Sequence, residues 1–446
     1  MSNRVRKFSR QPPYFENPIR IRMFHLMHTQ PLPVVAVILV LGVLLSVIVI
    51  ASHPISMKSG ETDTWWVIAL NLVHGNGYSL CLPQYFPFCS PSNQVTAMRE
   101  PVPVLLFTLA AWLGNGSLFV AEIVEVIIYL GIIASAYFLT REWADARSAV
   151  LASLLWTIYL PALELIPQAS GDLFAALCVS LGILFVLRAR RSQKTLDWIL
   201  AGLCLSMAVL SRSATLVIVG IVAGGQTLDG LRQRRQIIST IRPALLIAGL
   251  VLLIMAPWLI RNKLALGRTI LGSSLTGYNM YRHNYMIGQD HYFRYVGPEE
   301  GAQAIADLIA RHPDLDGDEN EAQMDLIYRK EALQVIKAHP ERYMSLSAYR
   351  ILALWFDWKI AEAYGHPTNR YGYTIMVLQA VLLVLAFVGS RKNVGQTWPL
   401  WGSILAMSAV YMAVDTRLLY VMPVMPLVIG LSAVGGNQII KKMLSE

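Results

Sequence analysis

The chain has 446 residues, of which 55% are hydrophobic and only 15% charged, and its mean hydropathy is +0.48. A soluble protein of this length could not bury so much apolar surface, so the composition excludes an ordinary soluble enzyme and indicates repeated membrane spans. The formal net charge of +9 is explained by basic cytoplasmic loops, and no basic stretch is interleaved with aromatic residues, so nucleic acid is not an expected partner.

The chain begins with a basic tail, residues 1–32, followed by an uncharged apolar run at 33–52. This run starts too far from Met1 for a signal peptide, and we interpret it as a retained span. Nine further apolar runs follow, at 118–139, 147–161, 171–187, 197–211, 213–228, 243–260, 371–389, 398–414 and 418–436. The sequence therefore predicts an all-α polytopic membrane protein with about ten, and at most twelve, transmembrane helices.

Charge in the short loops predicts the orientation. With the N-terminus in the cytoplasm, the cytoplasmic loops carry Arg141, Arg147, Arg188, Arg190, Arg191, Lys194, Arg232, Arg234, Arg235, Arg242, Arg391 and Lys392. The opposite short loops carry only Arg212 and Arg417. By the positive-inside rule, both termini are expected in the cytoplasm, with two long loops at 53–117 and 261–370 on the periplasmic side.

These loops divide the chain. We expect a cytoplasmic tail (1–32), a transmembrane module (33–260) that includes the first long loop, the second long loop (261–370), and closing transmembrane helices with a short cytoplasmic tail (371–446).

The first long loop contains two predicted helices. Residues 64–74 place Trp65, Trp66 and further apolar residues at helical spacing, and tryptophans at its start suit the membrane interface. Residues 103–113 are apolar but short, which favours an interfacial helix. Cys81 and Cys89 lie between the two helices. A periplasmic location permits a disulfide there, but the sequence leaves open whether it forms.

The second long loop contains amphipathic helices near 299–311 and 319–338 and an apolar helix at 341–358. We expect the last to be interfacial, because a crossing would invert the charge bias beyond it. The Asp-Gly-Asp stretch at 314–318 lacks the correctly placed glutamate of a calcium loop and is interpreted as a solvated turn.

Two outer carboxylates are candidate site residues. Asp63 follows the first span and precedes an aromatic helix, where partial desolvation would make it more basic and suited to proton abstraction. Asp172 begins the fourth span. Either residue could instead serve only as a helix N-cap.

Basic residues also gather on the outer side. Arginine suits bidentate phosphate binding, and anionic lipid headgroups would meet these side chains. Any one of them alone could be an interfacial anchor. They are Arg99, Arg212, Arg261, Lys263, Arg268, Arg282 and Arg417.

Five segments in chain order together resemble the GT-C membrane glycosyltransferases of the protein-mannosyltransferase and lipid A aminoarabinose-transferase type. The most recognisable is Pro-Trp-Leu-Ile-Arg-Asn at 257–262. The five segments are Asp63–Gly77, Arg99–Pro103, Gly171–Phe174, Ala256–Asn262 and Thr416–Pro426. Departures from the pattern are Thr64, where protein mannosyltransferases have a second acidic residue, Asp172 in place of a common glutamate, and the lack of a large soluble domain after the last span.

The resemblance implies transfer of a sugar from a polyprenyl-phosphate donor to an acceptor hydroxyl, with inversion at the anomeric carbon, in a bacterial inner membrane. Asp63 would be the general base. The implied phosphate-binding residues are Arg261, Arg282, Arg99, Arg212 and Arg417, and the implied substrate-binding residues are Asp172, Asn262, Trp258 and Tyr420. The departures favour an envelope lipid or glycan acceptor over a protein.

No cofactor is required by this chemistry, and a divalent metal is possible but not indicated, because no His/Asp cluster has ligand spacing. The outer histidines His74, His283 and His366 are expected to be structural or hydrogen-bonding. Two alternatives remain open: a glycolipid transporter or flippase, and a non-catalytic scaffold of the same fold. The near absence of charge inside the spans disfavours transport.

Overall fold

The structure is a computed structural model that describes residues 31–59, 61–89, 94–234, 236–290, 292, 296, 298–356, 370–391 and 393–445. Residues 1–30 of the predicted basic tail, and His366, lie outside the described residues.

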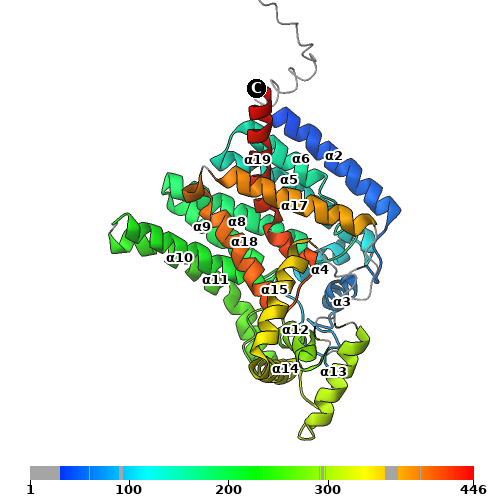
Figure 1. Cartoon of the computed structure of the whole chain (residues 1–446). Helices are drawn as coiled ribbons and strands as arrows, with labels where there is room; N and C mark the ends of the chain where they lie inside the picture. Colours follow the sequence, from blue (N-terminus) through cyan, green and yellow to red (C-terminus); the bar gives the residue numbers. More distant parts are fainter. Residues whose placement is uncertain are drawn as a thin grey trace, which may run out of the picture.

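All ten predicted spans are helical, and the predicted all-α polytopic architecture is confirmed (Figure 1). The described part of the chain contains no strand, only an isolated bridge between Ser79 and Val95. The bundle comprises α2 (Pro31–Ser52), α5 (Leu118–Trp143), α6 (Ala146–Thr157), α8 (Asp172–Ser192), α9 (Thr195–Val209), α10 (Leu216–Arg232), α11 (Ile237–Leu266), α17 (Arg370–Ser390), α18 (Val394–Val414) and α19 (Met425–Ser445).

Among the described residues, eight helices are long and apolar enough to cross a membrane. The two predicted spans that fall short are α6, with 12 residues, and α9, with 15. At 1.5 Å per residue, α6 is about 18 Å long, well below the ~30 Å hydrocarbon thickness. Both helices pack inside the bundle, α6 against α5 and α19, and α9 against α8 and α11.

The two long loops fold together below the bundle in Figure 1. They supply α3 (Thr62–Val73), α4 (Pro101–Leu113), α12 (Leu275–Asn284), α13 (Pro298–Arg311), α14 (Glu321–Ala338) and α15 (Pro340–Phe356). Every helix predicted in these loops is present, although residues 357–358 of the third lie outside the described residues. Helix α12 was not predicted.

Trp65 and Trp66 correct one expectation. They are 0% and 1% exposed and belong to a second hydrophobic core, formed by α3, α4, α12, α13 and α14. Protein therefore covers them, whereas the prediction placed them at the membrane interface. Helix α4 does present apolar residues at the surface, because Leu109 and Trp112 are exposed while Phe107 is buried.

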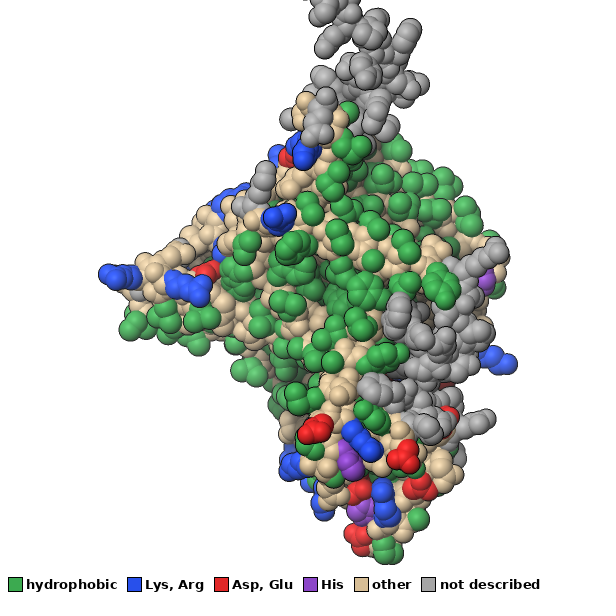
Figure 2. Space-filling model, viewed as in Figure 1, with side chains coloured by type: hydrophobic (Ala, Val, Ile, Leu, Met, Phe, Trp, Pro, Cys, Tyr) green, Lys and Arg blue, Asp and Glu red, His purple; other side chains and the backbone are tan. Residues whose placement is uncertain are grey.

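Hydrophobic side chains cover the middle of the visible face, and charged side chains gather at its ends (Figure 2). This distribution is typical of a protein that presents an apolar band to lipid and polar ends to water.

Candidate active site

A cavity of about 470 Å³ lies where the two long loops meet the ends of α10 and α18. Six arginines and four carboxylates line it, so its charged groups sum to an excess of two positive charges. The charged lining residues are Glu61, Arg99, Glu100, Arg212, Arg268, Arg282, Asp325, Arg329, Asp415 and Arg417. An anionic ligand suits such a cavity.

Glu61 immediately precedes α3 and points into this cavity. Its Oε2 lies 2.9 Å from Nη1 of Arg99 and 3.7 Å from Nη2 of Arg212, and its side chain is 29% exposed. Burial acts to raise the pKa of Glu61, but the charges of Arg99, Arg212 and Arg417 outweigh it and lower the pKa to about 2. Glu61 is therefore an ionised carboxylate accessible from the cavity.

Asp63 lies two residues further on, in the first turn of α3, and is not among the residues that line the cavity. It is half-buried, and partial burial raises its pKa above the usual range despite the nearby charge of Arg99. The predicted desolvation of Asp63 is therefore present, but the cavity-facing carboxylate of this segment is Glu61.

Arg212 connects the cavity to the start of α8. Its Nε and Nη2 donate to Oδ1 and Oδ2 of Asp172 at 2.7 and 2.5 Å, a bidentate pair whose side chains are 12% and 3% exposed. The guanidinium also lies 5.8 Å from the ring centroid of Tyr420. Asp172 itself does not line the cavity, so it acts by fixing the direction of Arg212.

Tyr420 lines the cavity and stacks on Tyr411, with ring centroids 4.6 Å apart. Its hydroxyl donates to Oδ2 of Asp415 at 3.2 Å. The same carboxylate oxygen lies 3.1 Å from Nε2 of His283, which is buried. The expectation that His283 forms a hydrogen bond is thus met, while His74 is exposed.

Arg261, Asn262 and Trp258 do not line the cavity. Arg261 donates to the carbonyls of Thr96 and Tyr78 at 2.6 and 3.1 Å, and its guanidinium lies over the Trp258 ring. The guanidinium of Arg261 thus binds backbone oxygens of the first long loop. A role of Arg261 in phosphate binding stays a prediction.

Asn262 and Trp258 hold a stretch of chain that does line the cavity. Helix α11 ends at Leu266, and Gly267 follows as its C-cap with a φ of +73°, a left-handed conformation that glycine adopts without strain. The chain after it is fixed by a 3.2 Å hydrogen bond from Asn262 to the carbonyl of Ile270, and by a 3.4 Å hydrogen bond from Trp258 to that of Gly272. Both acceptor residues line the cavity.

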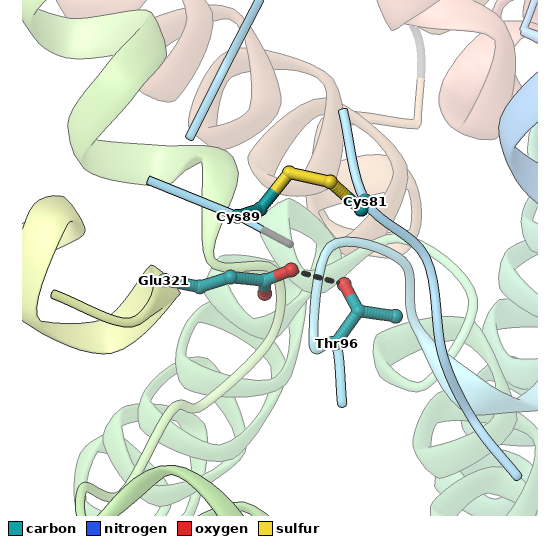
Figure 3. Close-up of a disulfide and its surroundings, with 4 residues drawn as sticks. All are labelled: Cys81, Cys89, Thr96 and Glu321. Atoms are coloured by element: carbon teal, nitrogen blue, oxygen red, sulfur yellow. Dashed lines mark hydrogen bonds between the residues drawn. A yellow bond between two sulfur atoms is a disulfide. The ribbon is translucent and has the colours of Figure 1, made fainter. Parts of the chain in front are cut away.

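The two long loops are tied together by Glu321, at the start of α14 (Figure 3). Its carboxylate accepts hydrogen bonds from the Thr96 hydroxyl, from the Ala97 amide at 2.9 Å and from the Ser274 hydroxyl at 2.7 Å. Nearby, Cys81 and Cys89 form a disulfide, which answers the question that the sequence left open.

The disulfide closes a short loop that contains Tyr85, another cavity-lining residue. The carbonyl of Tyr85 accepts a 2.9 Å hydrogen bond from the Tyr328 hydroxyl, and its ring makes an edge contact with Tyr278 at 5.0 Å. The cavity wall on this side is therefore fixed covalently and by aromatic packing.

Arg282 and Arg417, two of the residues to which the resemblance assigns phosphate binding, both line the cavity. Arg282 is buried on α12 and also donates to the carbonyl of Val296 at 2.6 Å. Four of the five predicted phosphate-binding arginines, Arg99, Arg212, Arg282 and Arg417, thus meet at one cavity.

Among the described residues, one group of three acidic side chains has ligand atoms close enough for a metal: Asp316, Asp318 and Glu319. It lies in the exposed turn before α14, where Glu319 already accepts hydrogen bonds from the amides of Asp316 and Gly317. Glu61, which lines the cavity, is paired with Arg99, and Asp172, which lies outside it, is paired with Arg212.

Sequence reasoning missed the cavity roles of Glu61, Glu100 and Tyr411. The signal for Glu61 was its position in the same acidic segment as Asp63. Glu100 lies inside the Arg-Glu-Pro motif, where its carboxylate accepts a 2.9 Å hydrogen bond from the Ser213 amide.

The chain is similar to known proteins in part of its sequence and in its fold. A family model described as dolichyl-phosphate-mannose-protein mannosyltransferase matches residues 98–260. An Archaeoglobus fulgidus oligosaccharyltransferase tethered to an acceptor peptide superposes with a TM-score of 0.55 at 15% identity, over 92% of this chain and 50% of that one. The match over residues 98–260 and the shared fold agree with the resemblance drawn from the sequence.

The archaeal oligosaccharyltransferase AglB from the same organism, in complex with an inhibitory peptide and a dolichol-phosphate, gives a TM-score of 0.53 at 17% identity, over 92% of this chain and 50% of that one. ArnT from Cupriavidus metallidurans bound to undecaprenyl phosphate gives a TM-score of 0.40 at 13% identity, over 91% of this chain and 78% of that one. The chain thus spans about half the length of the oligosaccharyltransferases. No curated protein matches it significantly by sequence.

Proposed function

We propose that the chain is a GT-C glycosyltransferase that moves a sugar from a polyprenyl-phosphate donor to an acceptor hydroxyl in the cavity beside Glu61. The observation that carries the proposal is the convergence of one accessible carboxylate with Arg99, Arg212, Arg282 and Arg417. The dolichol-phosphate bound to AglB, which has the same fold, supports a lipid phosphate as the anion.

In the proposed reaction, the acceptor oxygen attacks the anomeric carbon and the bond from that carbon to the phosphate oxygen breaks. The hydroxyl proton passes to a carboxylate, and polyprenyl phosphate leaves with the bonding electron pair. A single displacement with the base opposite the leaving group inverts the anomeric centre, by analogy with inverting hydrolases. Arginines around the leaving phosphate stabilise the negative charge that develops there.

Glu61 is the base we favour. Its pKa of about 2 makes it a weak base, because the charges of Arg99, Arg212 and Arg417 stabilise the ionised carboxylate. A bound phosphate would share Arg99, Arg212 and Arg417 with Glu61 and would add its own negative charge. Both changes raise the pKa of Glu61 and make it a better proton acceptor when the donor is present. Asp63, the residue suggested by the motif, is the competing candidate.

The finer features of the proposal are a periplasmic active site in a bacterial inner membrane and an envelope lipid or glycan as acceptor. The charge bias of the short loops supports the first. The second rests on the departures of the acidic motif from that of protein mannosyltransferases.

The test uses membranes from cells that express the full chain, incubated with a panel of polyprenyl-phosphate sugars. Mass spectrometry measures the released polyprenyl phosphate and glycosylated envelope lipids together. We expect E61Q to lower transfer by about 10²–10⁴-fold, the usual contribution of a general base. D63N should retain most activity, and E164Q, which changes an exposed carboxylate outside the cavity, is the control.

Loss of transfer in D63N with full activity in E61Q would move the base to Asp63. Full activity in both E61Q and D63N would show that neither carboxylate acts as the general base. Movement of sugar-lipid across sealed vesicles with no transfer to any acceptor would replace the proposal by transport.

A further inference from the structure

The cavity beside Glu61 has two ends, and different parts of the chain form them. The inner end lies against the turns that join helices of the bundle and holds Glu61, Arg99, Arg212 and Arg417. The outer end belongs to the second long loop and holds Arg268, Asn279 of α12, and Asp325 and Arg329 of α14. In Figure 1, α12 and α14 lie below the bundle, so the inner end is the one beside the spans.

The charges of the two ends act on different carboxylates. At the outer end, burial raises the pKa of Asp325, while the nearby charges of Arg329 and Arg268 act to lower it. The charges that lower the pKa of Glu61 are the three arginines of the inner end. The outer end is therefore a separate cluster of two arginines and one carboxylate, with an excess of one positive charge of its own.

The arginine donors of the outer end are open to a ligand. Oδ2 of Asp325 binds Nε of Arg329 at 2.8 Å, and Oδ1 accepts from the Gly277 amide at 2.5 Å, so the carboxylate is already bonded within the protein. The Arg329 side chain is 44% exposed, and its two terminal nitrogens have no hydrogen-bond partner among the described residues. Arg268 is exposed and has no ion pair with any described residue. Two guanidinium groups thus offer free N–H donors to the cavity.

Neutral groups beside these arginines suit a sugar. Asn279 lines the cavity and is only half-buried, so its amide can donate to and accept from sugar hydroxyls. Tyr85, in the loop closed by the disulfide, supplies an aromatic ring to the same cavity. Gly277 holds α12 close to α14, because a Cβ at its position would overlap the carbonyl oxygen of Asp325. The spacing between Asn279 and Arg329 is therefore fixed by packing.

We propose that the outer end of the cavity binds the acceptor, and that this acceptor is a sugar with a negatively charged group, a carboxylate or a phosphate, held by Arg268 and Arg329. The proposal rests on the proposed function, in which the inner end holds the phosphate of the donor. The anionic group takes no part in bond making. A hydroxyl of the acceptor attacks the anomeric carbon, its proton passes to Glu61, and polyprenyl phosphate leaves with the bonding electron pair.

The position of the two ends favours this assignment. The donor phosphate is attached to a polyprenyl chain that stays in lipid, so it belongs at the end beside the spans. The acceptor then occupies the end formed by α12 and α14. There, an acceptor of negative charge gains charge-assisted hydrogen bonds from the two arginines, which are roughly twice as strong as hydrogen bonds between neutral groups.

The test measures binding, independently of transfer. The purified full chain in phosphatidylcholine nanodiscs is first saturated with undecaprenyl phosphate, which occupies the inner arginines. It is then titrated with methyl glucuronide, methyl glucoside 6-phosphate or methyl glucoside, and saturation-transfer NMR gives each Kd. We expect at least one of the two anionic sugars to bind at least about tenfold more tightly than the neutral one, because only they pair with the arginines. The variant R268Q/R329Q should lose that preference.

The matched control is K330Q/K337Q. It removes the same two charges from exposed positions of α14 that do not line the cavity, so it should bind the sugars like the unaltered chain. R268Q alone keeps the pair of Asp325 and Arg329 and should show an intermediate preference, which makes the test readable even if R268Q/R329Q does not fold. Thermal melts check that each variant is folded.

Equal binding of the three sugars by the unaltered chain, or equal losses in R268Q/R329Q and K330Q/K337Q, would overturn the proposal. A loss of undecaprenyl phosphate binding in R268Q as large as its loss of anionic sugar would also overturn it, because Arg268 would then belong to the donor site. A preference for only the glucuronide or only the phosphate would support it and identify the anionic group. The proposed function is tested separately, by transfer in E61Q and D63N, so its failure is distinguishable from a failure here.

Discussion

The buried pair of Asp172 and Arg212 gives the sharpest prediction about stability. The two side chains are 3% and 12% exposed and share two hydrogen bonds, at 2.7 and 2.5 Å. Removing one member of such a pair leaves the other as an uncompensated buried charge, which typically costs about 3–5 kcal/mol. We expect the loss of stability in R212Q to lie near the upper end of this range, because Asp172 has no other ion pair among the described residues. D172N should be milder, because Glu61 lies 3.7 Å from Arg212.

The double variant D172N/R212Q removes both charges and should cost less than R212Q alone. A double-mutant cycle should therefore give a favourable coupling free energy of at least about 2 kcal/mol. The assay is reversible unfolding in mixed micelles with increasing SDS, followed by tryptophan fluorescence. The same cycle on Arg191 and Glu142, whose side chains are 66% and 20% exposed, should give no more than about 1 kcal/mol.

Additive effects in the first cycle, with a coupling energy near zero, would refute the reasoning that Asp172 and Arg212 stabilise the fold as a pair. All three variants should lose transfer activity regardless of stability, because Arg212 lines the cavity and Asp172 directs it.

Two further predictions concern the outer loops. The paired variant C81S/C89S should lose up to about 2.5 kcal/mol of stability by the loop-closure model, as measured by unfolding with and without reductant. Because the disulfide holds the loop of Tyr85, the variant should also raise the KM of transfer. Unchanged stability and KM would contradict the prediction. Burial lowers the pKa of His283 in the folded chain, although the negative charge of Asp415 acts to raise it. At a pH below about 6.5, the usual pKa of histidine, the unfolded chain therefore binds a proton that the folded chain does not. Stability should then fall with falling pH by up to about 1.4 kcal/mol per unit, and thermal melts from pH 7.5 to 5 should show a flatter slope for H283Q; equal slopes would contradict the prediction.

The helices of the fold could be predicted because membrane helices need only apolar length, which a single sequence displays. Helix α12 could not, because Leu-Thr-Gly-Tyr-Asn-Met-Tyr-Arg-His-Asn has no apolar stripe of helical period. Its helix is held by tertiary contacts: Tyr281 stacks on Tyr328 at 5.8 Å, and the Gly277 amide donates to Asp325 at 2.5 Å. These partners lie 47 and 48 residues away, beyond the reach of local pattern.

The sequence also predicted the side of the membrane for each arginine but not the direction of its side chain. Arg261 and Arg417 both follow apolar spans and both belong to the resembling motifs. Arg261 donates hydrogen bonds to the carbonyls of Thr96 and Tyr78, whereas Arg417 lines the cavity. The difference arises from the fold of the first long loop, whose position beside α11 no local feature of either segment encodes.

The choice between Glu61 and Asp63 follows from how the start of α3 faces the cavity. Glu61 is the residue just before α3, with a non-helical backbone, whereas Asp63 lies in the first turn of the helix, and only Glu61 lines the cavity. Trp65, four residues after Glu61, has its indole nitrogen 3.5 Å from Oε2 of Glu61, and the Trp65 ring lies 5.2 Å from the guanidinium of Arg99. The side of α3 that carries Glu61 and Trp65 is therefore the side that Arg99 packs against. If transfer depends on a carboxylate held among arginines, E61Q must lower it by about 10²–10⁴-fold while D63N spares it.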